Sequence, residues 1–157
     1  MERRHRRLPA HREDGNLSVG NAGNGARRFF HRVQGNINMD MIRVERLDLR
    51  ALGGADMVTI NDMSGTAFRE AYLDPGGADA AIDTVIVNGT ENVDHIKLKA
   101  HGTRVDVEGL QPETKLTGTE TSDVLQINAL GGDDKVDVHK GVSDLIGVQV
   151  DLGTGQS

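Results

Sequence analysis

The sequence predicts an all-β protein, built as a parallel β-solenoid (β-roll or β-helix-like) of short strands. Three observations support this prediction: aliphatic residues recur in pairs spaced two apart, glycine and aspartate gather between the pairs, and sequence units repeat. A spacing of two places both aliphatic side chains on one face of a strand. The 157 residues include 20 glycines, no cysteine and no tryptophan, which excludes a disulfide scaffold and a large aromatic core.

The first 24 residues are expected to form a basic, disordered arm, followed by a repeat domain over residues 25–157. Residues 1–32 carry eight arginines against three acids, a formal charge of +5, whereas the rest carries ten cations and 21 acids, a formal charge of −11. No apolar stretch follows the first charges, so the segment does not resemble a secretory signal peptide. A solvated tail is favoured over nucleic-acid binding, because the acidic body would repel phosphate. No apolar run approaches the about 18 residues of a membrane-spanning helix.

The strands are expected at short, near-regular intervals. Successive pairs are 9 to 14 residues apart, and each predicted strand is about three to five residues long, too short to be stable alone. Residues 61–83 are expected to form a bulging loop around a weak strand, because Pro75-Gly76-Gly77 predicts a turn. The aliphatic positions are Ile37/Met39, Leu47/Leu49, Val58/Ile60, Ala71/Leu73, Val85/Val87, Ile96/Leu98, Val105/Val107, Leu116, Leu125/Ile127, Val136/Val138 and Val148/Val150.

Two pairs of sequence units repeat. Residues 51–60 and 129–138 share six of ten positions, and residues 89–98 and 118–127 share Gly-Thr-Glu followed by an aspartate and spaced aliphatics. A solenoid, in which each strand stacks on its counterpart one coil away, accounts for such units. An antiparallel sandwich or barrel is the alternative, and it requires hairpin signals such as Asn88-Gly89 around the whole chain. The glycines predicted at the corners between strands are Gly53, Gly54, Gly89, Gly118, Gly131 and Gly132.

The units resemble the nonapeptides of the hemolysin-type (RTX) calcium-binding repeats, GGxGxDxUx, where U is a large aliphatic residue. Residues 89–97 match this pattern at a glycine, an aspartate and an aliphatic, and residues 118–126 match it at the same three positions. In that family the turn binds Ca²⁺ and the xUx half forms a short strand. The resemblance therefore implies weak Ca²⁺ binding, a secreted or cell-surface location, and truncation at the C-terminus, where glycine-rich nonapeptides are expected to begin.

The candidate Ca²⁺ ligands are aspartates at the glycine-rich corners. Because Ca²⁺ takes about six to eight oxygen ligands, one aspartate per corner suffices only where two corners converge. Asp133 and Asp134 form the densest carboxylate pair and are the strongest candidate. The alternative is that each aspartate closes a turn through its own backbone. The full set of candidates is Asp56, Asp83, Asp94, Asp123, Asp133 and Asp134.

The expected function is that of a non-catalytic, calcium-associated module of a secreted or cell-surface repeat protein. The sequence contains no HExxH, P-loop or GxSxG motif, so an enzyme is not expected. One alternative is a polysaccharide-binding or polysaccharide-cleaving β-helix, which requires aromatic platforms along one sheet, and another is an ion-free structural or adhesive repeat. The expected partners are calcium ions, with a cell-surface polysaccharide or another protein as alternatives, and exposed strand edges predict self-association through the ends of the stack.

Overall fold

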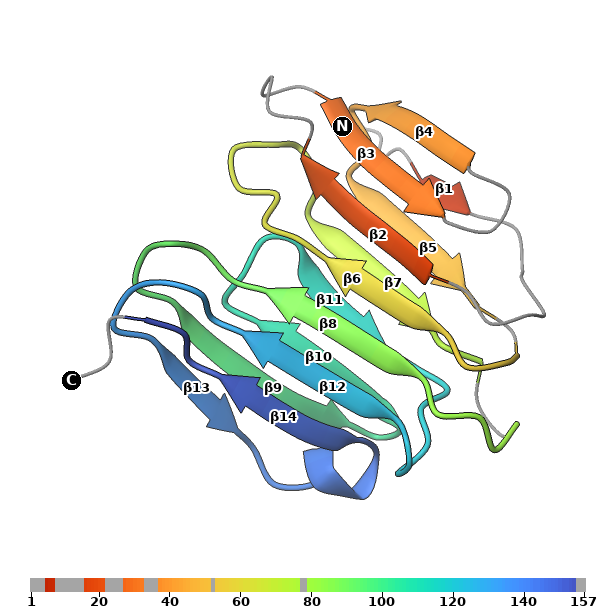
Figure 1. Ribbon diagram of the computed structural model, residues 1–157, viewed down its shortest axis with the longest axis vertical. Helices are drawn as coiled ribbons and strands as arrows, with labels where there is room; N and C mark the ends of the chain where they lie inside the picture. Colours follow the sequence, from red (N-terminus) through yellow and green to blue (C-terminus); the bar gives the residue numbers. More distant parts are fainter. Residues whose placement is uncertain are drawn as a thin grey trace.

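The computed structural model describes residues 5–7, 16–21, 27–32, 37–51, 53–76 and 79–154. These residues form two seven-stranded sheets, A and B, which lie face to face (Figure 1). In order across sheet A, the strands are β1 (His5–Arg7), β5 (Arg46–Arg50), β7 (Glu70–Asp74), β11 (Glu113–Leu116), β10 (Arg104–Glu108), β9 (His95–His101) and β13 (Lys135–Val138). Sheet B contains β14 (Gly147–Asp151), β12 (Val124–Asn128), β8 (Thr84–Asn88), β6 (Met57–Ile60), β2 (Asn16–Asn21), β3 (Arg27–Arg32) and β4 (Ile37–Ile42). A short 3-10 helix, η1 (Val142–Asp144), connects β13 to β14.

The prediction of a parallel β-solenoid is wrong, because both sheets contain antiparallel pairs. In sheet A, β10 is antiparallel to both of its neighbours, β9 and β11. In sheet B, β3 is antiparallel to both β2 and β4. The remaining pairs are parallel. A uniform coil requires parallel pairing at every step, so the architecture is a pair of mixed sheets.

A two-residue turn explains the antiparallel pairing of β9 with β10. His101 pairs directly with Arg104, and Gly102 between them has a φ of 64°. Two-residue connections with positive φ favour antiparallel hairpins, because their twist matches that of the paired strands. The predicted hairpin signal at Asn88-Gly89 has a different outcome, since β8 lies in sheet B and the next strand, β9, lies in sheet A.

The expected disordered arm contributes β1 to sheet A and β2 to sheet B, so the prediction is wrong for residues 5–7 and 16–21, and the rest of the arm lies outside the described residues. Strand β2 pairs in parallel with β6, with Leu17 opposite Val58 and Val19 opposite Ile60. All four of these side chains are buried. The segment combines an arginine-rich composition with the same spaced aliphatic pair that marks the later strands, and the aliphatic pair determines its structure.

Two further expectations about the middle of the chain can be compared with the structure. The strand predicted within residues 61–83 is confirmed as β7, but it lies inside sheet A between β5 and β11, with Ala71 and Leu73 buried, and is not a weak strand in a bulging loop. The repeated units do not stack on each other, because residues 51–60 contain β6 of sheet B and residues 129–138 contain β13 of sheet A. Direct neighbours such as β8 and β12 are instead 40 residues apart.

The core lies between the sheets and consists mainly of small aliphatic side chains. In β8, Val85 and Val87 are buried, whereas the residues between and beside them are only partly buried. Burial of one such side chain contributes about 1.5–3 kcal/mol, and strands such as β6 and β8 supply two of them. Phe68 adds one fully buried aromatic ring. With so few apolar side chains per strand, each strand depends on its neighbours in the stack.

Replacement of Gly109 by alanine tests the antiparallel segment of sheet A. Gly109 follows β10 with a φ of 96°, and a Cβ atom there would lie 2.0 Å from the carbonyl oxygen of His95. Gly65 is the matched control, because its φ is 77° and no heavy atom lies within 4 Å of an added Cβ. We expect Gly65→Ala to cost about 1 kcal/mol of unfolding free energy from φ alone, and Gly109→Ala to cost about 2–4 kcal/mol. Equal costs in denaturant unfolding would contradict this packing.

Candidate functional site

Five of the six aspartates predicted as Ca²⁺ ligands lie directly before strands, and all five are buried. We call these five residues the aspartate ladder, and Figure 1 shows the strands that they precede side by side in the two sheets. The ladder consists of Asp56, Asp83 and Asp123 before β6, β8 and β12 of sheet B, and of Asp94 and Asp134 before β9 and β13 of sheet A.

Neighbouring members of the ladder are joined by two hydrogen bonds that run in opposite directions. The N–H of Asp56 donates to Oδ1 of Asp83 at 2.8 Å, and the N–H of Asp83 donates to Oδ1 of Asp123 at 3.0 Å. In return, the carbonyl oxygen of Asp56 accepts from the N–H of Thr84, and that of Asp83 accepts from the N–H of Val124, both at 2.8 Å. One aspartate therefore fixes the start of its own strand and that of its neighbour.

The same arrangement holds in sheet A, with an additional turn closure. The N–H of Asp94 donates to Oδ1 of Asp134 at 2.8 Å, and the carbonyl oxygen of Asp94 accepts from the N–H of Lys135 at 2.9 Å. The carboxylate of Asp94 also accepts from the N–H and the hydroxyl of Thr90. In sheet B, Oδ2 of Asp123 likewise accepts from the N–H of Glu120 at 2.7 Å. These aspartates close their own turns and also hold a neighbouring strand.

The aspartate ladder provides only part of the oxygen coordination that Ca²⁺ requires. In the described part of the chain, the one group of three acidic or histidine residues whose ligand atoms lie within 4.8 Å of one another does not include a ladder aspartate. Asp133, the sixth predicted ligand, is exposed beside Asp134. Oδ2 of Asp134 is buried and accepts no hydrogen bond. Asp133 and Asp134 therefore retain carboxylate oxygens that could face a cation.

Three of the six predicted corner glycines have a positive φ, namely Gly54, Gly118 and Gly132. The other three, Gly53, Gly89 and Gly131, do not, and at Gly89 the reason for glycine is close packing. A Cβ atom on Gly89 would lie 2.7 Å from Oδ2 of Asp94 and 3.0 Å from the carbonyl oxygen of Ala129. The space beside this backbone is thus occupied by the aspartate ladder.

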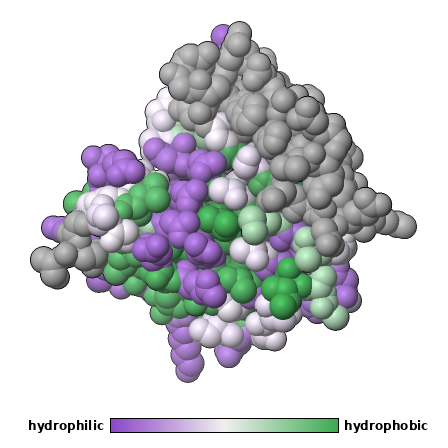
Figure 2. All heavy atoms as spheres, viewed as in Figure 1, coloured by the Kyte–Doolittle hydropathy of each residue, from purple (hydrophilic) through white to green (hydrophobic). Residues whose placement is uncertain are grey.

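A row of asparagines at the opposite ends of the sheet B strands was not predicted. The amide of Asn88 donates to Oδ1 of Asn61 at 2.8 Å, and the amide of Asn128 donates to Oδ1 of Asn88 at 2.9 Å. These three residues, the asparagine ladder, each follow directly after an aliphatic pair, and this recurring position is the signal that could have identified them. Figure 2 shows a band of hydrophilic residues across the described surface in the region where β8 and β12 end.

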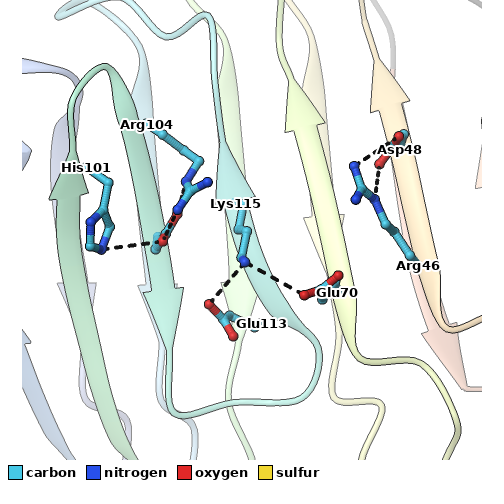
Figure 3. A network of polar contacts seen from close by, with 8 residues as sticks. Arg46, Asp48, Glu70, His101, Arg104, Glu113 and Lys115 are labelled. Atoms are coloured by element: carbon cyan, nitrogen blue, oxygen red, sulfur yellow. Dashed lines mark hydrogen bonds and ion pairs between the residues drawn. The ribbon is translucent and has the colours of Figure 1, made fainter. Parts of the chain in front are cut away.

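The outer face of sheet A carries a network of paired charges (Figure 3). Arg46 contacts Asp48 through two hydrogen bonds and also stacks on Tyr72, with its guanidinium 3.6 Å from the ring centroid. On the other side of Tyr72, Lys115 lies 3.7 Å from Glu70. A shallow cavity of about 330 Å³ adjoins this group, lined by Arg46, Asp48, Leu49, Arg50, Tyr72, Leu73, Asp74 and Thr117. Among the described aromatic side chains, Phe68 is buried and Tyr72 has this arginine over its ring, so these two do not form the aromatic platform that the polysaccharide alternative requires.

The group of ligand-type side chains within 4.8 Å of one another is His101, Asp106 and Glu108, also on sheet A. Both carboxylates already have cationic partners. Arg104 donates to both oxygens of Asp106, at 2.7 and 2.9 Å, and Lys99 donates to Glu108 at 2.6 Å. The hydrogen bond from Lys99 lowers the pKa of Glu108. A divalent cation here would have to compete with two fixed positive charges, so this group fits an ion-pair network better than a metal centre.

Burial and nearby acids disfavour the charged form of Asp83. Burial, only partly offset by the hydrogen bond from Asp56 and reinforced by the charge of Asp123, raises the pKa of Asp83 to about 6. The ordinary value is 3.8. Between these two values the folded chain binds more protons than the unfolded chain, so this group makes the protein less stable as the pH rises.

Asp83→Asn tests this effect. The amide oxygen of asparagine can still accept the N–H of Asp56, while the buried charge is removed. We expect the natural chain to lose up to about 3 kcal/mol of unfolding free energy from Asp83 between about pH 4 and pH 6, and Asp83→Asn to flatten this decline. The exposed Asp144→Asn is the control and should leave it unchanged. Parallel pH profiles of the natural chain and Asp83→Asn in urea unfolding would show that the charge of Asp83 is not buried.

A scan against models of known protein families, a search of curated proteins and a search of solved structures gave no match to this chain. The resemblance to the hemolysin-type repeats therefore stays a prediction. Among the described residues, no helix is long and apolar enough to cross a membrane.

Proposed function

We propose that this chain is a non-catalytic structural module in which aspartates hold neighbouring strands together directly. The observation that carries this proposal is the pair of opposed hydrogen bonds at each of three steps, Asp56 to Asp83, Asp83 to Asp123, and Asp94 to Asp134. A hydrogen bond from a backbone N–H to a carboxylate is charge-assisted and stronger than a neutral one. A carboxylate oxygen used in this way does the work that a bridging cation would do at a corner.

The outer face of sheet A supports a scaffold role. Its charged side chains pair with one another, as Arg104 does with Asp106 and Lys99 with Glu108. A strand face covered by paired charges stays solvated without presenting a single-sign field. The resemblance to hemolysin-type repeat proteins supports a position in a secreted or cell-surface protein, where such a module would serve as a spacer or adhesive scaffold.

Weak Ca²⁺ binding at Asp133 and Asp134 is the second candidate. It is favoured by the buried Oδ2 of Asp134, which accepts no hydrogen bond, beside the exposed carboxylate of Asp133. Ca²⁺ sites of extracellular modules commonly have millimolar affinity. At ten times its dissociation constant, an ion that binds only the folded chain would add about 1.4 kcal/mol of stability.

The two candidates differ in what Asp134 contributes when no ion is present. Asp134→Ala removes the acceptor of the buried N–H of Asp94, so we expect it to cost about 1–3 kcal/mol of unfolding free energy in chelator. Asp133→Ala is the matched control and should cost less than about 0.5 kcal/mol, because the residue is exposed. Equal effects of the two variants in chelator would contradict direct bonding through the ladder.

A calcium titration of the melting temperature completes this experiment. The structural proposal predicts no difference between Ca²⁺ and Mg²⁺ up to ~10 mM, well into the range of weak extracellular sites. A rise specific to Ca²⁺ that disappears in Asp133→Ala would favour the second candidate, since this variant leaves the hydrogen bond between Asp94 and Asp134 intact.

A further inference from the structure

The two sheets end together at the C-terminal end of the stack. Strand β13 is the last strand of sheet A and β14 is the last strand of sheet B (Figure 1). Val138 pairs with Leu98, and Val150 pairs with Ile127, in the registers of the neighbouring strands. Leu98 and Ile127 are fully buried, whereas Val138 is 45% exposed and Val150 is 42% exposed. The pattern of inward aliphatic residues therefore continues to an end at which these two valines are uncovered.

The opposite end of the stack presents one terminal strand from each sheet, β1 of sheet A and β4 of sheet B. Along sheet A from β1 to β13, two antiparallel steps occur, both at β10, so β1 and β13 run in the same direction. Along sheet B from β4 to β14, two antiparallel steps also occur, both at β3, so β4 and β14 run in the same direction. A second copy shifted along the stack would thus place β1 beside β13 and β4 beside β14, with both new pairs parallel.

The strand number of the two sheets makes this arrangement possible. Each sheet contains seven strands, so both edges at one end can meet both edges at the other. None of the twelve pairs between the described strands has to change for this to occur, because only the terminal strands gain a partner. The new pairs would be of the same parallel kind as β9 with β13 and β12 with β14.

The sequence gives the two ends opposite charge. The strands β1, β3 and β4 together contain five arginines against one aspartate, a formal charge of +4. Residues 131–157, which include β13 and β14, carry five aspartates against two lysines, a formal charge of −3. Opposite charges attract unlike ends and repel like ends, which favours one relative orientation of two copies.

We propose that copies of this chain associate head to tail, with β13 and β14 of one copy pairing with β1 and β4 of the next. The contact is heterologous, because each copy uses two different surfaces. A head-to-tail contact that does not close into a ring adds copies without limit. The product is a row of copies in which the two sheets and the core between them run on from one chain to the next.

Sedimentation velocity over a concentration series tests the association. We expect the average mass to rise above that of the monomer between about 1 μM and about 1 mM, the range of weak to moderate affinity. The double variant Val138→Lys with Val150→Lys places two charges on the uncovered end and should weaken association at least about tenfold, or about 1.4 kcal/mol. The control is Met57→Lys with Ile82→Lys, at positions 40% and 57% exposed on or before the internal strands β6 and β8, and it should associate like the natural chain. A natural chain that stays monomeric throughout, or equal effects of the two double variants, would overturn the proposal.

Cross-linking tests the orientation, because the chain has no cysteine of its own. Asn38→Cys marks β4, and Gln149→Cys marks β14. With a short bismaleimide, we expect covalent dimers when the two variants are mixed, and none when either variant is treated alone. Dimers formed by Gln149→Cys alone would indicate tail-to-tail contact and overturn the head-to-tail arrangement. This outcome does not depend on the result of the calcium titration, so the two proposals can fail separately.

Discussion

A buried carboxylate directly before a strand is the interaction on which the rest of this structure depends. The strands whose side chains are described contribute at most two buried aliphatic residues each, and such short strands gain little stability by themselves. The aspartate ladder compensates by fixing where neighbouring strands begin. At one step, the side chain of Asp123 accepts the N–H of Asp83, and the carbonyl oxygen of Asp83 accepts the N–H of Val124. With the starts aligned, Val85 and Leu125 fall opposite each other in the core. Alignment at one edge thus sets the packing of the interior.

Acidic residues have two different environments in this protein. On the outer face of sheet A, carboxylates such as Asp106 and Glu108 have arginine or lysine partners that neutralise them. At the strand starts of sheet B, Asp83 is buried and faces other acids, and the hydrogen bond from the N–H of Asp56 offsets this only in part, so the pKa of Asp83 rises. The ladder therefore stabilises the alignment of the strands at an electrostatic cost, and that cost is the physical reason why a cation near the corners would be favourable.

The positions of the strands from β4 onward could be predicted from the sequence, whereas β1, β2 and β3 and the directions of the strands could not. Every predicted aliphatic pair lies in a strand, because spacing of two is a local property. The direction of pairing depends on turns: Asn88-Gly89 does not form a hairpin, whereas the chain reverses between β9 and β10 at Gly102. Five of the six predicted ligand aspartates are buried at strand starts, whereas bonds such as those to strands 40 residues away depend on long-range packing that no local pattern contains.

Amide hydrogen exchange at the ladder positions measures the central interaction directly. If the carboxylates accept backbone protons, the amides of Asp56, Asp83 and Asp94 should exchange as slowly as those of core residues such as Val85, and equally slowly in chelator and in Ca²⁺. Exchange at the rate of exposed loop amides would contradict the account. So would protection that appears only when Ca²⁺ is added, because the strand starts would then be held through an ion.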